Sequence, residues 1–417
     1  MFGKNIKKIF QFEFFSGIIL IFTVLSTIII ANSHFNSYYQ ELLNINIFPN
    51  LIKFTITDFI NDFLMAIFFL LIGIDLKKEI LFGELSTKAR ASLPIIGAVG
   101  GVVFPVAIFY FFNYNLENHL SGFAIPTATD IAFAFGVVAI FGNKISASSR
   151  VFIISLAVVD DIIAITMIAL FYSKSIQFSY FLIAVIANIL IYFFNINFLK
   201  SNQEGSKLLI ICNLLFFIIT WCLVLKSGVH STISGILFAI ALPMQYKKSA
   251  SQNSTKSFAE KKNNIENYFR SNKIFVWQIL KTITPMVNYI ILPLFIFANS
   301  AIDLQSFESK FLFNPLFLGI FLGLFIGKQL GVMLFSYLAI RLKFSHLPRD
   351  CDWLEFYGIS ILAGIGFTMS IFIANLSFVS EQLLNISKIA IFLASATSMI
   401  FGVLVLVFNN YYRIKYD

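Results

Sequence analysis

The stretch VFIISLAVVDDIIAITMIALFY, residues 151 to 172, is apolar enough to cross a membrane but carries two adjacent aspartates at its centre, Asp160 and Asp161. A charged side chain at the centre of a bilayer costs about 2.5 to 3.5 kcal/mol on insertion scales, and ionisable residues inside membrane segments usually have a function. The pair therefore indicates a membrane protein and marks the first place to look for its chemistry.

The composition of the whole chain is that of a polytopic membrane protein. Hydrophobic residues make up 58% of the 417 residues and charged residues only 12%, whereas soluble domains have about 25% charged residues. Reading apolar runs of about 20 residues as membrane helices predicts an all-α protein. The twelve predicted spans are residues 14–32, 59–76, 93–113, 122–142, 150–172, 178–198, 207–224, 228–244, 283–301, 314–340, 354–378 and 386–408.

The basic residues are distributed unevenly between the two sides that these spans define. Of the 30 Lys and Arg residues, 24 lie on the side of the termini, five lie on the other side, and Lys328 lies inside the tenth span. Cytoplasmic loops of membrane proteins are enriched in Lys and Arg. We therefore expect both termini in the cytoplasm, and the net charge of +9 needs no nucleic-acid partner.

The chain is predicted to form a single transmembrane domain over residues 1–417, with its first apolar run kept as an uncleaved helix. Residues 245–282 are rich in Lys and Asn and predict a flexible cytoplasmic loop. Residues 44–57 alternate polar and apolar side chains around Pro49, which predicts a small extracytoplasmic β-hairpin. The hairpin either pairs with a second copy or remains an ordered loop on its own protein.

Two predicted spans contain helix breakers next to polar residues. FAIPTATDIAFAFG, residues 123–136, has Pro126 shortly before Asp130, and LAGIGFTMSIF, residues 362–372, has two glycines near Thr368. Pro and Gly weaken a helix, and backbone freed inside a membrane must be buried in protein or line a wet cavity. Interrupted spans in both halves of a chain indicate a transporter's binding site. An ordinary proline kink and a glycine packing face are the alternative.

Four ionisable residues lie near mid-membrane: Asp130, Asp160, Asp161 and Lys328. Unpaired, they would cost on the order of 12 kcal/mol, so they must pair or face water. Neighbouring residues point about 100° apart on a helix, so one aspartate of the doublet can meet Lys328 while the other faces a cavity. A buried structural ion pair is the alternative, but it leaves one carboxylate unexplained.

The surplus negative charge suits a hard monovalent cation held by carboxylates, threonine hydroxyls and carbonyl oxygens. No Cys belongs to this group and His is scarce, so zinc and copper are disfavoured, and no cofactor is implied. Burial and repulsion between carboxylates also favour their protonated form. One site that holds protons and a metal cation in alternation is the physical basis of exchange.

Further ionisable residues lie near the ends of predicted spans. Asp62 lies near the extracytoplasmic end of the second span, and Asp75, Lys78 and Glu79 lie at its cytoplasmic end. These residues form either solvated helix ends with i,i+3 and i,i+4 pairs or ion funnels that respond to pH. His230, in LKSGVHSTISG, is either a structural residue or a pH-responsive group.

Several of these segments resemble the bacterial NhaA-type sodium/proton antiporters. The resemblance extends from about residue 14 to residue 408, and the matching segments, in chain order, are FINDFLMAIFFLLIGIDLKKE, IPTATDIAFAFG, SLAVVDDIIAI, LKSGVHSTISG, LPLFIFANS, FIGKQLG and GIGFTMSIFIA. The resemblance implies inverted repeats with the fourth and eleventh helices interrupted. It also implies electrogenic exchange of sodium or lithium for protons by alternating access, in a homodimer of the bacterial inner membrane.

The resemblance also assigns roles to residues. It implies Asp161 as a direct sodium ligand, Asp160 as the partner of Lys328 and a second sodium ligand, and Asp130, beside Thr129, as the residue that offsets half-helix dipoles. It implies funnel or pH-response roles for the acidic and basic residues at the ends of the second helix and for one histidine: Asp62, Asp75, Lys78, Glu79 and His230.

The chain departs from familiar members at several positions, among them Asp75 and Lys78, which stand in place of a glutamate and an arginine. Gln329 replaces a proline after the tenth-helix lysine, and Leu280, Lys281 and Thr284 stand where those members have a glutamate and histidines. These departures concern the pH at which exchange begins.

Two other functions fit some of the same residues. A passive cation channel would more naturally show a repeated filter loop or rings of charge from several subunits. An intramembrane aspartyl protease would carry a Gly-x-Gly-Asp motif, and Phe367 stands at the aspartate position here. We therefore expect an antiporter that serves sodium and pH homeostasis, and no enzyme.

Overall fold

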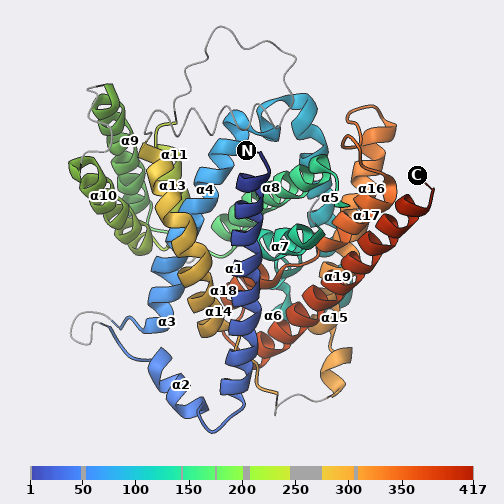
Figure 1. Cartoon of the computed structure of the whole chain (residues 1–417). Coiled ribbons are helices and arrows are strands. Elements are labelled where there is room, and N and C mark those ends of the chain that lie inside the picture. Colours follow the sequence, from blue (N-terminus) through green and yellow to red (C-terminus); the bar gives the residue numbers. More distant parts are fainter. Residues whose placement is uncertain are drawn as a thin grey trace. The chain divides into compact units, whose positions relative to one another are not determined.

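The computed structural model describes residues 2–47, 53–141, 144–173, 176–200, 207–244, 275–304 and 309–416. All the regular elements in these ranges are helices, which confirms the predicted all-α class (Figure 1). The described chain divides into two compact units, here called unit 1 and unit 2.

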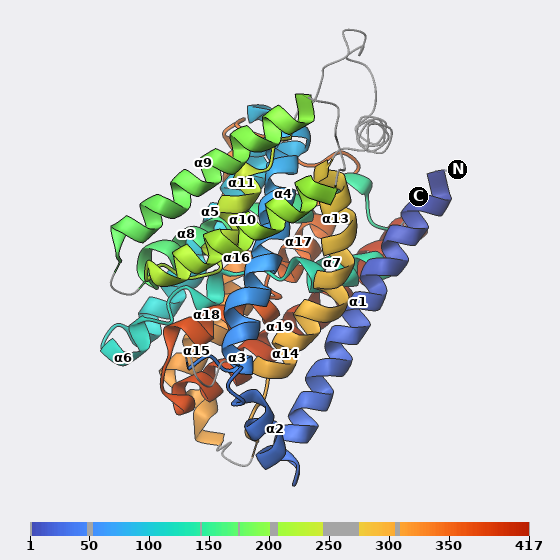
Figure 2. The ribbon, with the colours of Figure 1, turned by 90° about the vertical axis from the view of Figure 1, so that its left-hand side faces the viewer.

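Unit 1 comprises residues Met1–Ile56, Thr87–Ile168 and Leu292–Asp417. Its helices are α1 (Phe2–Ala31), α2 (Asn36–Leu43), α5 (Lys88–Asn113), α6 (Glu117–Leu120), η3 (Ile125–Thr127), α7 (Ile131–Phe141), most of α8 (Ala147–Phe171), α14 (Leu292–Asn299), η6 (Ser309–Phe313), α15 (Pro315–Leu322), η7 (Gly323–Gly327), α16 (Lys328–Arg341), α17 (Trp353–Leu362), α18 (Phe367–Ser377) and α19 (Glu381–Tyr416). Helix α5 packs along α16, α17 packs on α19, and α1 packs on α7 and α14 (Figures 1 and 2).

Glycines set the distance between α5 and α16. A Cβ atom on Gly331 would overlap the carbonyl group of Gly100, and a Cβ on Gly100 would overlap the carbonyl oxygen of Gly331. Small residues let membrane helices approach closely enough for backbone contact. This packing positions Lys328, which lies one turn before Gly331 on the same helix.

Unit 2 comprises residues Thr57–Ser86 and Ala169–Ile291. Its helices are η1 (Phe59–Leu64), α4 (Met65–Phe82), η2 (Glu84–Ser86), α9 (Phe178–Lys200), α10 (Lys207–Lys226), α11 (Ile233–Ala241), α13 (Phe275–Met286) and η5 (Val287–Ile291), and the three-residue α3 (Ile56–Asp58) leads into η1. Helix α4 packs on α11 and α9 packs on α10. The amides of Asn195 and Asn213 bond each other across the α9–α10 contact, at 2.9 and 2.8 Å.

Within the described ranges, nine helices are long and apolar enough to cross a membrane, or up to eleven if each of two bent pairs is one span. One pair joins Phe15–Ala31 to Asn36–Leu43 with a bend of 113°, and the other joins Trp353–Leu362 to Phe367–Ser377 with a bend of 40°. These helices make the chain a multi-pass membrane protein. The predicted count of twelve spans is not confirmed.

The predicted span that does not appear among these eleven is the eighth one, residues 228–244. It is helical only over α11, whose nine residues extend about 14 Å at 1.5 Å per residue. Gly228 has a positive φ of 76°, a conformation that a residue with a side chain adopts only at a cost. A hydropathy pattern does not reveal this turn, which delays the start of the helix.

The predicted β-hairpin at residues 44–57 is not confirmed either. The described part of this segment contains an isolated antiparallel bridge between Asn46 and Thr55 and no strand, and residues 48–52 lie outside the described residues. An isolated ribbon of two strands is marginal in water.

The predicted cytoplasmic loop, residues 245–282, lies outside the described residues up to residue 274. Its last eight residues belong to α13, which begins at Phe275 and buries Val276 and Leu280. The helix therefore begins before the apolar run that marks the ninth predicted span.

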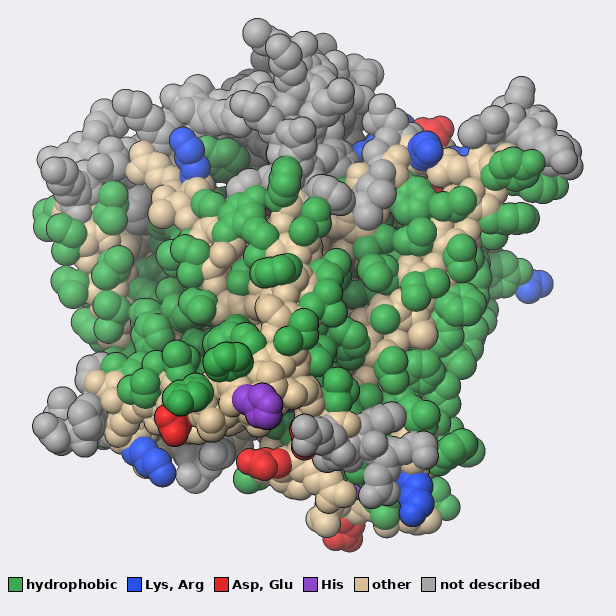
Figure 3. Space-filling view, turned by 60° about the horizontal axis from the view of Figure 1, so that its bottom comes forward, with side chains coloured by type: hydrophobic (Ala, Val, Ile, Leu, Met, Phe, Trp, Pro, Cys, Tyr) green, Lys and Arg blue, Asp and Glu red, His purple; other side chains and the backbone are tan. Residues whose placement is uncertain are grey.

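The described surface suits a membrane protein. Figure 3 shows a face covered mainly by hydrophobic side chains, with few charged side chains, which lie towards its margins. Lipid tails solvate apolar side chains, so their exposure carries no penalty there.

Candidate ion-binding site

Two non-helical segments of unit 1 meet inside the protein. Residues 128–130 separate η3 from α7, and residues 363–366 separate α17 from α18. The N–H of Asp130 donates to the carbonyl oxygen of Ile365 at 2.6 Å, and the hydroxyl of Thr129 lies 2.8 Å from the carbonyl oxygen of Ala363. The two interruptions thus supply hydrogen-bond partners for each other, as buried backbone requires.

The glycines in the second segment permit this close approach. A Cβ on Gly366 would lie 3.0 Å from the carbonyl oxygen of Ala128, and a Cβ on Gly364 would lie 2.6 Å from that of Leu324. A larger residue at position 366 would therefore press against the segment 128–130, and one at position 364 would press against η7.

Asp130 is buried at the N-terminal ends of two helices. Its carboxylate accepts the N–H of Phe133 in α7 and of Thr368 in α18, each at 3.0 Å, and also accepts the Thr368 hydroxyl. Helix N-termini carry unsatisfied N–H groups and partial positive charge. One carboxylate therefore satisfies donors of both helices and opposes both dipoles.

Lys328 forms a fully buried ion pair with Asp160. The ammonium lies 2.7 Å from the carboxylate, and both side chains are 0% exposed. Lys328 also donates to the carbonyl oxygen of Thr127, and the Thr129 hydroxyl donates to the same carboxylate oxygen of Asp160 at 2.8 Å. The pair therefore links α16 and α8 to the non-helical segment before α7.

Asp161 is buried to the same extent but has a different environment. Its Oδ1 has no hydrogen-bond partner among the described residues, and the same holds for Oδ1 of Asp160. The charges that act on Asp161 include the carboxylates of Asp160 and Asp130 as well as Lys328. A buried carboxylate without a partner is costly unless a proton or a cation neutralises it.

The helix that carries Lys328 is irregular at this point. The five residues before it form η7, a π-helix over Gly323–Gly327, and such bulges occur frequently at functional sites. Gln329 donates its side-chain amide to the carbonyl of Phe325 at 2.6 Å. A proline, which the resemblance to known antiporters leads one to expect at position 329, would have no side-chain donor for this bond.

The possible cation ligands among the described residues of this site are oxygen atoms. Among the described residues, no group of three or more His, Cys, Asp and Glu side chains is placed to hold a metal ion. The oxygens near the pair are those of Asp160, Asp161, the Thr129 hydroxyl and the carbonyls of Thr127 and Ala363. Oxygen ligands of this kind suit a hard cation rather than a transition metal.

The other predicted site residues belong to unit 2. The carboxylate of Asp62 accepts the hydroxyl of Ser231 at 2.6 Å, and the indole of Trp221 donates to the Asp62 carbonyl at 3.2 Å. The adjacent His230 has Nδ1 2.9 Å from the Thr232 hydroxyl. The structure therefore brings Asp62 close to the turn that carries His230.

The charged residues at the end of α4 form local contacts. Asp75 and Lys78 are partly exposed and lie 3.8 Å apart, and Glu79 accepts the N–H of Glu84 at 2.9 Å. Lys77 donates to the carbonyls of Ile240 and Leu242, at 2.7 and 2.5 Å, and so satisfies acceptors at the end of α11.

Two features escaped the sequence analysis. Thr368 bonds Asp130, but 238 residues separate the two, and no local pattern reveals such a contact. Arg413 of α19 pairs with Asp352 at 2.8 Å and with the buried Glu355 at 3.0 Å, both at the start of α17. Burial, together with these two carboxylates, raises the pKa of the neighbouring Cys351 thiol to about 12.

Comparisons with known proteins find relatives over nearly the whole chain. A family model described as Na+/H+ antiporter 1 matches residues 7–406. The chain is 37% identical over 413 residues to the Na(+)/H(+) antiporter NhaA of Pelagibacter ubique, covering 98% of each chain. It is 38% identical over 404 residues to Na(+)/H(+) antiporter NhaA 2 of Campylobacter fetus, covering 95% of each. It is 39% identical over 407 residues to the protein of the same name from Campylobacter jejuni subsp. doylei, covering 96% of this chain and 98% of the relative.

Proposed function

The chain belongs to the Na+/H+ antiporter 1 family, and from this premise we propose that it exports sodium ions in electrogenic exchange for protons. It is a transporter and not an enzyme. Lithium replaces sodium as a substrate, the protein works by alternating access, and residues 1–417 act as a single transport domain. The exchange serves sodium and pH homeostasis.

The observation that supports this proposal is the unequal environment of two adjacent buried carboxylates. Asp160 has Lys328 and Thr129 as partners, whereas Oδ1 of Asp161 has none among the described residues. A buried group of this kind requires a counterion. Protons and sodium ions compete for it, so binding of one releases the other.

The residues have distinct roles in the proposal. Asp161 and Asp160 bind sodium with the Thr129 hydroxyl nearby, and Lys328 neutralises Asp160 when sodium has left. Asp130 compensates the two helix N-termini that point at it. Two carboxylates and one ammonium lie around a single monovalent ion, so the exchange can move more than one proton for each sodium ion, which makes the cycle electrogenic.

Alternating access requires a part that moves around the site. We propose twelve membrane segments arranged as inverted repeats, with the fourth and eleventh interrupted at residues 128–130 and 363–366. Segments held by each other's polar groups rather than by continuous helices can rearrange with few hydrogen bonds broken. This is the arrangement that many transporter folds use.

The charged residues of unit 2 serve entry, exit and pH response. Asp75, Lys78 and Glu79 lie at one end of the second membrane segment and form the cytoplasmic funnel, and Asp62 marks the opposite funnel. Histidine is the side chain whose unperturbed charge change falls between pH 5 and 8, and His230 lies in the turn that contacts Asp62. We propose that its protonation adjusts exchange to pH.

The orientation follows from charge. The first residues of α1 and the last of α19 lie at the same end of unit 1 (Figures 1 and 2), and the twelve predicted spans assign 24 of the 30 basic residues to the side of the termini. We place both termini in the cytoplasm and the protein in the bacterial inner membrane, surrounded by lipid, as a homodimer.

The decisive experiment replaces the unpaired carboxylate. In proteoliposomes with an imposed pH gradient, added sodium should collapse the gradient through the wild-type protein, and Asp161→Asn should reduce this response at least tenfold at every pH. Asp350→Asn is the matched control, because Asp350 is exposed and has a positive φ of 56° that asparagine tolerates. Undiminished exchange by Asp161→Asn contradicts the proposal.

The same assay tests which cations the protein transports. Lithium chloride should collapse the gradient as sodium chloride does, and potassium chloride should not, because a compact set of oxygens fits the smaller ions. A passive channel, the rival function, would pass sodium without moving protons. Equal responses to sodium and potassium would overturn the proposed selectivity.

A further inference from the structure

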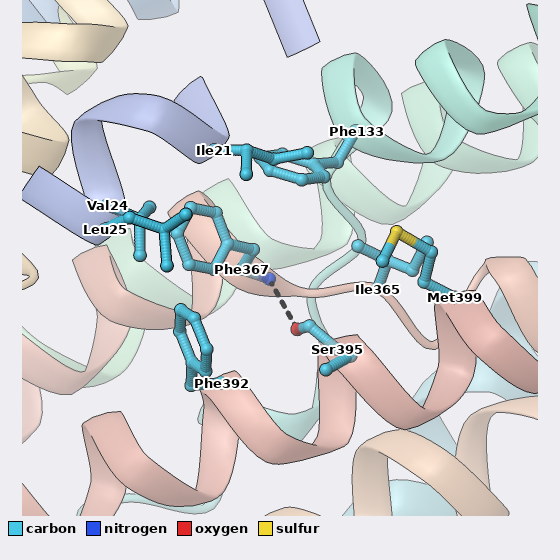
Figure 4. A pocket seen from close by; sticks show the side chains of 10 residues that line it. Ile21, Val24, Leu25, Phe133, Ile365, Phe367, Phe392, Ser395 and Met399 are labelled. Atoms are coloured by element: carbon cyan, nitrogen blue, oxygen red, sulfur yellow. Dashed lines mark hydrogen bonds between the residues drawn. The ribbon is translucent and has the colours of Figure 1, made fainter. Parts of the chain in front are cut away.

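Unit 1 contains an apolar cavity beside the interruption between α17 and α18. Its volume is about 190 Å³, and side chains of α1, α7, α19 and the interrupted segment surround it (Figure 4). The lining residues are Ile21, Val24, Leu25, Phe133, Ile365, Phe367, Phe392, Ser395, Ala396 and Met399. The polar lining side chain, Ser395, already accepts the N–H of Phe367 at 3.3 Å.

The cavity lies at the depth of lipid tails. Residues 21–25 are central in the segment Phe15–Ala31, and residues 392–399 are near the middle of Glu381–Arg413. An apolar cavity of about 150 Å³ remains dry and binds small apolar molecules. This cavity is of similar size and offers water no set of two to four polar partners, so an apolar occupant is favoured over water.

The cavity also borders the surface that lipid covers. On α1, Leu25 and Ile21 line it, yet they are 52% and 41% exposed. The medium beside an exposed apolar side chain at this depth is the acyl chains of the bilayer. We propose that the cavity is a binding site for the end of one acyl chain of a membrane lipid, inserted between α1 and α19.

Three of the lining residues connect the occupant to the buried carboxylate of Asp130. Phe133 donates its N–H to that carboxylate, Ile365 accepts the N–H of Asp130, and Phe367 precedes Thr368, which also donates to it. The rings of Phe133 and Phe367 lie 5.0 Å apart, and those of Phe367 and Phe392 lie 6.0 Å apart. An acyl chain therefore contacts the aromatic side chains that adjoin this end of the ion site.

The test measures lipid binding, which does not depend on transport. The full-length protein is reconstituted with phosphatidylcholine that carries a diazirine near the terminal methyl of one acyl chain, irradiated, digested and mapped by mass spectrometry. We expect adducts on Met399 and Phe392. The same lipid with the diazirine near its headgroup should give at least fivefold fewer adducts at these residues, because the cavity lies deep.

Filling the cavity provides the control. Ala396→Phe and Met399→Phe place extra ring atoms in it from different positions on α19, and each should lower the adduct yield on Phe392 at least fivefold. Leu404→Phe adds bulk on the exposed side of the same helix and should leave the yield unchanged. Equal labelling of Phe392 in the filled variants and wild type, or no labelling in wild type, overturns the proposal.

A second readout links this site to the proposed function. This readout rests on the proposed function. Once the comparison of wild type with Asp161→Asn has established sodium/proton exchange, Ala396→Phe should change the rate of sodium-driven exchange at least twofold, and Leu404→Phe should not. Labelling without a rate change leaves a lipid site uncoupled from exchange and removes the connection through Asp130. Failure of the exchange assay itself would leave the labelling result intact.

Discussion

Lys328 and Asp160 form an ion pair inside the protein, out of contact with solvent. Both side chains are fully buried, with 2.7 Å between their charged groups. Burying two charges costs several kcal/mol for each, and removing one partner of such a pair typically costs about 3–5 kcal/mol because the other charge remains buried. The folded protein is therefore most stable when both members of the pair are present or when both are removed together.

A double-mutant cycle tests this dependence. Lys328→Gln should lower the free energy of unfolding by about 3 kcal/mol or more, whereas the double variant Lys328→Gln with Asp160→Asn should regain at least half of the loss, since the carboxylate that loses its partner is removed as well. Reversible unfolding in mixed detergent micelles, followed by circular dichroism, measures both. Lys281→Gln, on an exposed side chain, should change little. A double variant no more stable than Lys328→Gln would contradict the argument.

The charged residues of the site could be recognised from the sequence, but their pairing could not. Asp130, Asp160, Asp161 and Lys328 stand out because charge inside an apolar run is costly. Spacing alone allowed either aspartate of the doublet to meet the lysine, and the choice of Asp160 came from the resemblance to known antiporters. The structure has Asp160 beside Lys328. The contact of Thr368 with Asp130 depends on tertiary packing and has no local signal.

At the scale of helices, backbone contact between α5 and α16 holds Lys328 in place. Gly100 and Gly331 meet without side chains between them. Any added methyl group meets backbone atoms, which cannot rotate away as a side chain can. The two helices must therefore separate, and Lys328, one turn away, moves with α16.

The prediction for this contact compares two identical substitutions. Gly331→Ala should lower the free energy of unfolding by about 1–3 kcal/mol, as overpacking does, and should slow exchange by displacing Lys328. Gly17→Ala, in α1, meets no atom within 4 Å and should keep or raise stability, because alanine favours a helix over glycine by about 1 kcal/mol. Thermal melting in detergent and the proteoliposome assay report the two effects. Equal stability of both variants would refute a tight contact.

The elements themselves were predictable to different degrees. Apolar runs correctly indicated helices because their length matches a bilayer. The same runs gave no information on where a turn delays a helix, as Gly228 does before α11, or on α13 beginning at Phe275, ahead of its apolar run. The alternation of polar and apolar residues around Pro49 predicted a β-hairpin. Within the described part of that segment, only one isolated β-bridge forms.

At the scale of the whole molecule, the basic residues define a direction across the membrane. The loop between α16 and α17 lies at the end of unit 1 that carries both termini, and the start of α19 lies at the opposite end (Figure 1). Arg341 ends α16, and Lys343 and Arg349 lie in the loop that follows it, whereas Lys388 is the basic residue near the start of α19. Positive charge should keep the loop after α16 in the cytoplasm.

Cysteine labelling tests this orientation. In a variant without Cys212, Cys222 and Cys351, Val379→Cys should react with a membrane-impermeant maleimide on intact cells, and Phe344→Cys should react only in inverted vesicles or opened cells. Both native side chains are exposed, so access to each depends on its side of the membrane rather than on burial. Sodium-driven exchange by both variants would show that they are folded. Labelling of position 344 from outside intact cells would reverse the orientation, and the direction of sodium export with it.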